Sequence, residues 1–533
     1  ATITVSGGLA LSTSASEAFT ATGGGTVNVT QNNISIVNTI TTTSGTALNI
    51  ANTTIGASGL TFRSITAGTG TGSAGSGIIL NNTGGSGGLT VTGTGSAGSG
   101  GTIQHKTGVD ASTNGVGIYL NTTRDVSLSS MQLNDFDNFG IYGTSVTNFS
   151  LANTVVSGAN GTSTPSREGS VIFDNLLGTG SITGVTISGG IEDNLRVENS
   201  SGTLSALTIA NCTVQNNSTV SGNMGIFVAS KTSASVTATI QSCTLRGNRT
   251  IGIRGDAADS STLNITINNN TIAAGTGGNN QGNQGIEVSD ASNGTVTFDV
   301  ENNLVGTLDG STATPLLSTG INIFNGTSGT ATMTGKVIGN TVLNDPTTAS
   351  GTSNGFGIRV FNSNLAAIRA KVSNNTVKFV NTDYGILAEA SGTASAPSGS
   401  QGRLDVEVSG NNVDVNDANA LDAIRLQARN FSTICARVPS NTTDSGGSGF
   451  VGLFARQANS ATFNIEGLAS GAQAAATAQA YLAGQNPAAT TVGTIAVTNF
   501  TGVAANSCSI PTLLAAGGEG PGAPAGSALT QAQ

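Results

Sequence analysis

The chain has 533 residues, of which 76 are Gly and 9 are Pro, and its formal net charge is −9. Charged residues make up 9% and aromatic residues 4% of the sequence, which contains no Trp. Collagen is excluded because no Gly-X-Y period runs through the chain, and a helical membrane span because no stretch approaches about 18 consecutive apolar residues. The acidic balance and the lack of a Lys/Arg run argue against nucleic-acid binding.

A Gly-Ile step, followed by one variable residue and another aliphatic residue, recurs along the chain. Its clear copies are Gly77-Ile78, Gly117-Ile118, Gly140-Ile141, Gly225-Ile226, Gly252-Ile253, Gly285-Ile286, Gly320-Ile321, Gly357-Ile358 and Gly385-Ile386. With weaker copies there are roughly fourteen units, spaced by about 23 to about 40 residues, as is typical of solenoids.

A second marker follows later in each unit, where an alternating apolar run reaches an Asn or Gly-Asn step. Examples are ITINNNTI (265–272), VIGNTV (337–342) and VSNNTV (372–377). The alternation predicts strands with one buried face. Asn tolerates left-handed backbone and can turn the corner, and stacked amides can bond along the column. We therefore predict an all-β right-handed parallel β-helix of roughly fourteen irregular coils, about 4.8 Å apart. Tandem β-sandwiches are the structural alternative.

Composition divides the chain into four parts. Residues 1–40 are expected to form N-terminal strands or a cap, and residues 41–460 the parallel β-helix. Residues 461–510 are expected to form a C-terminal cap, because a capping-box pattern starts an Ala-rich run that predicts one helix ending near Leu482. Residues 511–533 are predicted to be a flexible tail or linker.

These repeats resemble those of bacterial extracellular proteins with right-handed parallel β-helices, a group that includes adhesins and autotransporter-like passengers. The resemblance covers residues 40–460 as a style of repeat. Residues 424–508 resemble a terminal segment of some large surface β-strand-repeat proteins. The matching pieces are Ile434-Cys435-Ala436, Asn441-Thr442, Phe463-Asn464-Ile465, the Ala-rich run, Asn486-Pro487 and Cys508. The resemblance implies secretion and surface display, but no particular ligand.

Four cysteines give two structural expectations. Cys212 and Cys243 occupy the corner column that Asn270 and Asn303 hold in later units. Neighbouring coils would bring them within disulfide range, so a disulfide and a pair of stacked thiols are both open. Cys435 and Cys508 flank the capping segment, and we predict that a disulfide between them pins it to the last coils. Such a bond would indicate an oxidising compartment.

The variable residue of each Gly-Ile-x-aliphatic unit is expected to point outward, between two inward aliphatic side chains. In the first half of the chain these residues are Ile79, Tyr119, Tyr142, Ile172, Arg196 and Phe227. The second half continues with Arg254, Glu287, Asn322, Arg359, Leu387, Arg425 and Phe454. Because apolar surface often marks a contact with a partner, the first six form a candidate contact face. A surface stabilised only by stacking is the alternative.

Little in the sequence indicates catalysis. Of the elements of a polygalacturonase-like site only Asn381-Thr382-Asp383 is present, and the lone His105 lies beside Lys106 in a polar stretch. We predict no catalytic residue, no metal site and no cofactor. Calcium is the most plausible ion, but it needs six to eight oxygen ligands. The acidic groups that could supply a few are Asp135/Asp137, Asp405/Glu407 and Asp414/Asp417/Asp422.

The function predicted from the sequence is that of a non-catalytic extracellular surface or matrix protein, a rod acting as an adhesin or structural element. Two alternatives are a self-assembling subunit of extracellular fibres or layers, and a β-helix protein that binds or degrades polysaccharide. The expected partners are further copies of the chain or glycans of a host or surface. Neither nucleic acid nor a membrane span is expected.

Overall fold

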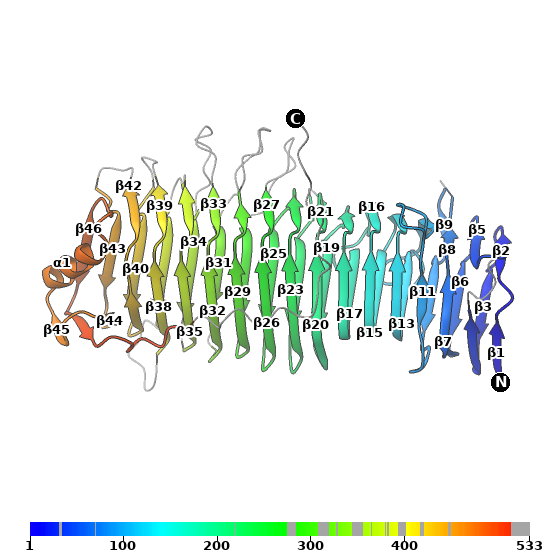
Figure 1. Cartoon of the computed structure of the whole chain (residues 1–533), viewed down its shortest axis with the longest axis horizontal. Coiled ribbons are helices and arrows are strands. Elements are labelled where there is room, and N and C mark those ends of the chain that lie inside the picture. The colour runs from blue at the N-terminus through cyan, green and yellow to red at the C-terminus, as the bar shows by residue number, and fades with distance from the viewer. Residues whose placement is uncertain are drawn as a thin grey trace, which may run out of the picture.

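The computed structural model describes residues 1–30, 35–69, 71–218, 220–273, 284–290, 292–306, 319–326, 329–343, 355–363, 365–378, 380, 383–392, 401–415, 420–445 and 449–512. These residues form an elongated stack of strands, with helix α1 (Ala475–Gln485) near its C-terminal end (Figure 1). Nearly every element is a strand, and the strands build long parallel sheets. The architecture is that expected of a β-solenoid.

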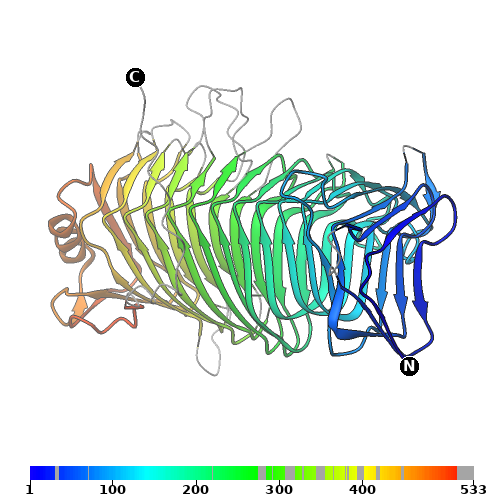
Figure 2. The same ribbon diagram turned by 45° about the vertical axis from the view of Figure 1, so that its right-hand side comes forward.

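The strands fall into three columns, which we call face 1, face 2 and face 3. Along the sequence the chain visits face 1, face 2 and face 3 in turn and then returns to face 1 beside the preceding strand. Three long strands bend from face 1 into face 2, namely β13 (Ile118–Ser129), β15 (Phe139–Ala152) and β17 (Gly169–Thr183). Figure 2 shows the resulting layered rod from a second direction.

The remaining strands of face 1 are β3 (Phe19–Thr22), β6 (Leu48–Ala51), β10 (Ile78–Asn81), β19 (Asp193–Asn199), β22 (Met224–Ser230), β25 (Ile251–Ala257), β28 (Gln284–Asp290), β31 (Thr319–Asn325), β34 (Ile358–Ser363), β37 (Ile386–Ser391), β40 (Ile424–Arg429), β43 (Leu453–Gln457) and β46 (Val492–Ala496). Those of face 2 are β1 (Thr2–Val5), β4 (Thr26–Val29), β7 (Thr54–Phe62), β11 (Leu89–Val91), β20 (Thr203–Ala210), β23 (Ser235–Gln241), β26 (Thr262–Asn268), β29 (Thr295–Glu301), β32 (Thr332–Ile338), β35 (Ala367–Ser373), β38 (Arg403–Ser409), β41 (Thr433–Arg437), β44 (Thr462–Glu466) and β47 (Phe500–Val503).

Face 3 contains β2 (Ala10–Thr13), β5 (Thr39–Thr42), β8 (Ser64–Ala67), β12 (Thr102–Thr107), β14 (Gln132–Phe136), β16 (Val155–Asn160), β18 (Thr186–Ser188), β21 (Thr213–Gln215), β24 (Thr244–Arg246), β27 (Thr271–Ala273), β30 (Leu304–Val305), β33 (Thr341–Leu343), β36 (Thr376–Lys378), β39 (Asn412–Val415) and β42 (Thr442–Ser445). Two short strands complete the set: β9 (Ser73–Ala74) pairs with β12, and β45 (Gly471–Gln473) pairs antiparallel with β47.

The alternation of buried apolar residues with partly exposed residues explains why these segments form strands. In β26, Leu263, Ile265 and Ile267 are buried, while the residues between them are partly exposed. Inward side chains of this kind form one apolar cluster that runs from Val27 to Phe500. Because a single coil cannot bury its apolar side alone, the stacking of coils supplies the hydrophobic stabilisation.

Asparagines turn the corner between faces 2 and 3 in the second half of the stack. Asn269 has φ 53° and Asn302 φ 54°, in the left-handed region that Asn tolerates. The next residue along the chain is buried and donates its side-chain amide to the equivalent residue of the following coil. This asparagine ladder comprises Asn270, Asn303, Asn340, Asn375, Asn411, Asn441 and Asn486, with Nδ2–Oδ1 distances of 2.9–3.1 Å.

The two ends of the stack differ. Within residues 1–40, β1 pairs with β4, β2 with β5 and β3 with β6, so this part lies in the same three columns as the rest. At the other end β44, β46 and β47 continue the columns, and α1 packs on the last coil through Ala478 and Leu482. Of the predicted tail, residues 513–533 lie outside the described part of the chain.

Candidate functional site

The outer side of face 1 carries the variable residue of each Gly-Ile-x-aliphatic unit. We call this column the face-1 strip. Its members stand in register from strand to strand: Ile79, Tyr119, Tyr142, Ile172, Arg196, Phe227, Arg254, Glu287, Asn322, Arg359, Leu387, Arg425 and Phe454. The aliphatic neighbours point inward, as with Ile226 and Val228, both fully buried.

Three of the six residues expected at the exposed contact face are in fact covered. Ile172 is 0%, Arg196 2% and Phe227 7% exposed. The connections from face 3 to face 1 fold back over the strip here: Val116 packs beside Ile172, and the carbonyl of Arg167 accepts a bond from Arg196. Sequence periodicity gives the direction of a side chain but not the path of the loops, and this part of the prediction was therefore wrong.

Ile79, Tyr119 and Tyr142 are partly exposed and stay available on the outer surface. Tyr119 and Tyr142 have ring centroids 6.2 Å apart, and Tyr142 stacks on Phe139 at 4.5 Å. The hydroxyl of Tyr142 donates to Asp174 over 3.0 Å. The rings are therefore held in fixed positions at the N-terminal end of the strip.

Ion pairs occupy the middle of the strip and the column beside it. Nη1 of the buried Arg196 lies 3.1 Å from Asp193 and 3.7 Å from Glu192. On the next outward column, Glu198 contacts Arg167 at 2.7 Å and Lys231 at 2.8 Å. Burial raises the pKa of Glu198, but the hydrogen bonds from the two cations outweigh it and lower that pKa to about 2.

Further along, arginines alternate with carboxylates and aromatic rings. The guanidinium of Arg254 lies 3.1 Å from Glu287 and 3.3 Å from Asp256, and 5.6 Å from the ring centroid of Phe227. Arg425 contacts Asp422 at 2.9 Å. Each of these carboxylates is thus engaged by an arginine, which leaves little scope for a free general acid or base.

A cluster of aromatic residues on face 1 went unrecognised in the sequence. Phe324 and Phe361 lie two residues beyond the strip position of their strands and stack at 5.6 Å, while Phe356 and Tyr384 precede the Gly-Ile steps and stack at 6.1 Å. The guanidinium of Arg359 lies among the three phenylalanines. These rings could have been found by extending the register by three residues before and two residues after each strip position.

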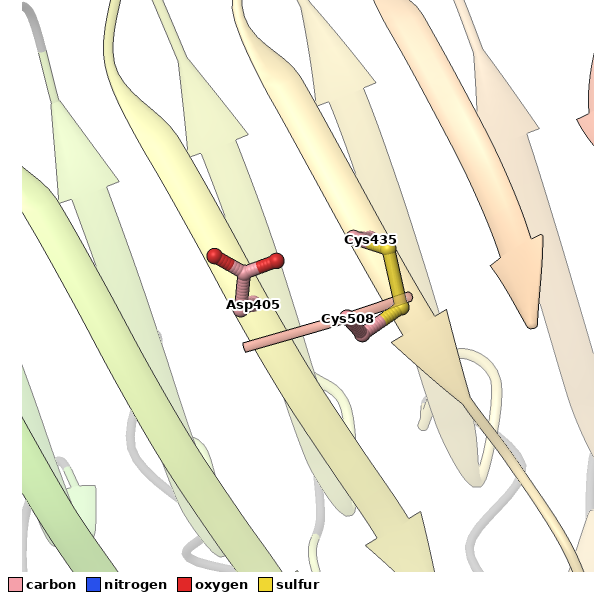
Figure 3. Close-up of side chains that lie close together, drawn as sticks. All are labelled: Asp405, Cys435 and Cys508. Carbon is pink, nitrogen blue, oxygen red and sulfur yellow. A yellow bond between two sulfur atoms is a disulfide. The ribbon is translucent and has the colours of Figure 1, made fainter. Parts of the chain in front are cut away.

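The cysteines fall into two different arrangements. Cys435 on β41 and Cys508 form a disulfide with a Cα–Cα distance of 5.4 Å, which holds residues 504–512 against the outside of face 2 (Figure 3). The N–H of Cys508 also donates to Glu466 over 3.0 Å. Cys212 and Cys243 are free and buried on neighbouring coils, so the stacked-thiol alternative describes the structure and the disulfide between them does not.

The one group of three potential His, Cys, Asp or Glu ligands found among the described residues is Asp405, Cys435 and Cys508. Both sulfurs are bonded to each other (Figure 3), and Asp405 is engaged by Arg403 at 2.6 Å. The arrangement therefore offers no thiolate to a metal ion. Of the other acids considered for calcium, Glu407 is engaged by Lys371 at 3.4 Å, Asp137 by the N–H of Gly108 at 3.0 Å and Asp422 by Arg425 at 2.9 Å, while Asp135 lies 3.9 Å from His105. Oδ1 of Asp414 is buried without a hydrogen-bond partner, and Asp417 lies outside the described residues.

The remaining titratable candidates, His105, Asp383 and Lys106, lie in three different settings. His105 has φ 50° and lies 3.9 Å from Asp135 at the surface. Burial raises the pKa of Asp383, while residues 381 and 382 of the Asn-Thr-Asp sequence lie outside the described residues. Lys106 is fully buried and donates to the carbonyls of Ser44 and Gly45, out of reach of a substrate.

A cavity of about 520 Å³ lies between the C-terminal segment and the outside of face 2. Lys371, Arg437 and Glu466 line it together with residues 506–512. Arg437 pairs with both Glu407 and Glu466, so the charges at this cavity neutralise one another. The cavity is therefore a weaker candidate for a ligand-binding site than the face-1 strip.

Comparison of the chain with known protein families, curated proteins and solved structures finds no match. No helix within the described residues has the length and apolar character needed to cross a membrane. The class that fold and surface define is a β-solenoid with an arginine- and aromatic-rich strip along one face.

Proposed function

We propose that the chain is a non-catalytic extracellular surface or matrix protein, a rod that acts as an adhesin or structural element through its face-1 strip. The observation that carries the proposal is the gathering of arginines and aromatic rings on one outer face. Aromatic residues and Arg are the types enriched in the core of binding interfaces. Because only 4% of the residues of the chain are aromatic, their gathering on one face favours a contact surface over a random distribution.

We further infer that the solenoid is a right-handed parallel β-helix of roughly fourteen coils. Parallel strands joined by crossovers are right-handed in about 98% of known cases. A rod of stacked coils displays a strip of any length on a rigid support, which suits a surface protein.

Secretion is supported by the disulfide between Cys435 and Cys508, since such bonds persist in oxidising compartments. The proposal that the chain is non-catalytic is supported by the pairing of Glu287, Asp256 and Asp422 with arginines. The expected partners are glycans of a surface or further copies of the chain.

Assembly into fibres or layers is the second candidate, and the low charge of the first coils favours it, because few charges oppose strand pairing with another molecule. Each of β1, β2 and β3 has a described partner on one side only, and Ile3 is 64% exposed. Unpaired strand edges readily accept strands of another molecule. Within residues 1–62, Glu17 is the single charged side chain that could oppose such pairing.

The proposal is tested by passing the purified chain over beads that carry a neutral glucan, a glycan with glucuronic acid groups, or the chain itself. We expect retention on at least one bead type. It should fall about tenfold in the variant Tyr119→Ser/Tyr142→Ser/Phe454→Ser, which removes strip rings. Arg369→Ser, on the exposed side of face 2, is the matched control and should leave retention unchanged.

Equal retention of parent and strip variant would contradict the proposal, as would no retention on any bead. Melting curves of the variants establish that they are folded. Incubation with the glucuronic acid glycan should release no sugar, and turnover that is lost on Asp383→Asn would favour the enzyme alternative.

A further inference from the structure

Arg359 differs from the other arginines of the strip in what surrounds it. Its guanidinium carbon lies 4.3 Å from the ring centroid of Phe361, 5.3 Å from that of Phe356 and 5.5 Å from that of Phe324. Three rings thus hold one cation by cation–π contacts. Contact with aromatic rings is compatible with hydrogen bonding, because a guanidinium carries five N–H donors in its plane.

No carboxylate among the described residues lies within 4 Å of Arg359, whereas Arg254 has two and Arg425 has one. Its Nε is buried without a hydrogen-bond partner, and its Nη groups are not among the buried unpartnered atoms, so they reach solvent. Burial lowers the pKa of Arg359, but the side chain stays charged at neutral pH. Arg359 is thus a partly desolvated cation whose Nη donors reach solvent.

We propose that Arg359 and its three phenylalanines form a subsite for the single carboxylate of a sparsely charged acidic glycan. The carboxylate would accept two parallel N–H bonds from the guanidinium edge, the geometry that Arg favours. Phe324, Phe356 and the adjacent Tyr384 offer flat apolar surfaces to the C–H faces of the flanking sugars. The inference rests on the proposed function, because it places a glycan on the face-1 strip.

The surrounding charge indicates why the glycan should be sparsely charged. Glu389, Asp383 and Glu287 all lie near enough to Arg359 to raise its pKa, and the chain as a whole carries −9. One carboxylate can bond the guanidinium directly, but further anions along a dense polyanion would face these acids and be repelled. The subsite thus selects for isolated acid groups.

The test uses the full chain and fluorescent oligosaccharides that are identical except at one position, which carries glucuronic acid, glucose or a sulfated glucose. Fluorescence anisotropy at low and high salt gives each Kd. We expect the glucuronic acid probe to bind about tenfold or more tightly than the glucose probe. The sulfated probe tells whether a sulfate can replace the carboxylate as the anion.

Arg359→Gln should reduce binding of the acidic probe to the level of the neutral one, and Arg359→Lys should restore it only in part, because a lysine has no planar fork. Arg369→Gln removes the same charge from face 2 and should change nothing. Melting curves verify that each variant is folded. Equal binding of the acidic and neutral probes, or equal binding by parent and Arg359→Gln, would overturn the subsite. Tighter binding of polygalacturonate than of the single-acid probe would overturn its preference for sparse charge.

The two proposals fail in different ways. If the subsite alone is wrong, Arg359→Gln keeps bead retention while Tyr119→Ser/Tyr142→Ser/Phe454→Ser loses it. If the strip is not a contact surface, that triple variant keeps its retention whatever happens at Arg359.

Discussion

The side chain of Asn441 donates from Nδ2 to Oδ1 of Asn486 over 3.0 Å, and the backbone N–H of Asn441 donates to the same oxygen over 2.9 Å. Asn486 ends helix α1, and its own Nδ2 donates to the carbonyls of Val438 and Leu482 over 2.7 and 2.9 Å. A single buried side chain therefore joins the covering helix to the asparagine ladder.

Asn486→Ala should loosen α1 without unfolding the stack. The change leaves the buried donors of Asn441 without their acceptor, at a cost of about 2 kcal/mol or more. Amide hydrogens of the helix should then exchange about thirtyfold faster in hydrogen–deuterium exchange. Gln485→Ala, at the exposed neighbouring position, is the control. Unchanged exchange in Asn486→Ala would show that the ladder does not hold the helix.

Lys106 should make stability increase with pH in the alkaline range. Burial lowers its pKa from 10.5 to about 8, so between these values the unfolded chain binds a proton that the folded chain does not. The free energy of unfolding should therefore rise between about pH 8 and pH 10.5. Denaturant unfolding of parent and Lys106→Met across this range tests it, and the rise should be smaller in the variant. Identical slopes would contradict the assignment.

Glu198 should contribute stability that is lost in acid. Its ordinary pKa of 4.5 falls to about 2 in the folded chain, so its contribution is complete above pH 4.5 and disappears as the pH approaches 2. We expect about 1–2 kcal/mol, because Arg167 and Lys231 are partly solvated. Glu198→Gln should lower the melting temperature at pH 7 and reduce its dependence on pH below 4.5. A parallel shift at every pH would contradict an electrostatic origin.

Removal of the disulfide by Cys435→Ser/Cys508→Ser should free the C-terminal segment. The bond closes a sequence separation of 73 residues, and the chain-entropy account gives about 4 kcal/mol for a loop of this size. Limited proteolysis should then cut within residues 504–512, where the parent resists cleavage. Treatment of the parent with a reductant should reproduce the result, and resistance of both samples would mean that packing alone holds the segment.

The repeating parts of the structure are those that sequence reasoning predicts. Asparagine recurs at the same corner in the second half of the stack, as at Asn270 and Asn303, and the period of two along a strand fixes which aliphatic residues point inward. A register defined by one motif therefore extends over the whole stack. The positions of Cys435 and Cys508 on either side of the capping segment predict their pairing, which the structure confirms.

The irregular parts could not be predicted in this way. Ile172 and Arg196 point outward as the pattern requires, yet connections of irregular length cover them. The aromatic surroundings of Arg359 combine residues from three separate segments, and their meeting depends on loop paths that no periodicity records. The sequence therefore predicts that the strip side chains point outward, but it does not predict which of them remain exposed.

Hydroxyl-radical footprinting of the chain, free and retained on the bead type that binds it, tests the contact role of the face-1 strip most directly. We predict that Tyr119, Phe361 and Phe454 are oxidised more slowly in the retained chain, while Leu365, 42% exposed and outside the strip, reacts equally in both. Unchanged oxidation of the three strip residues, together with protection of Ile3 in β1, would contradict the account and favour assembly through the first coil.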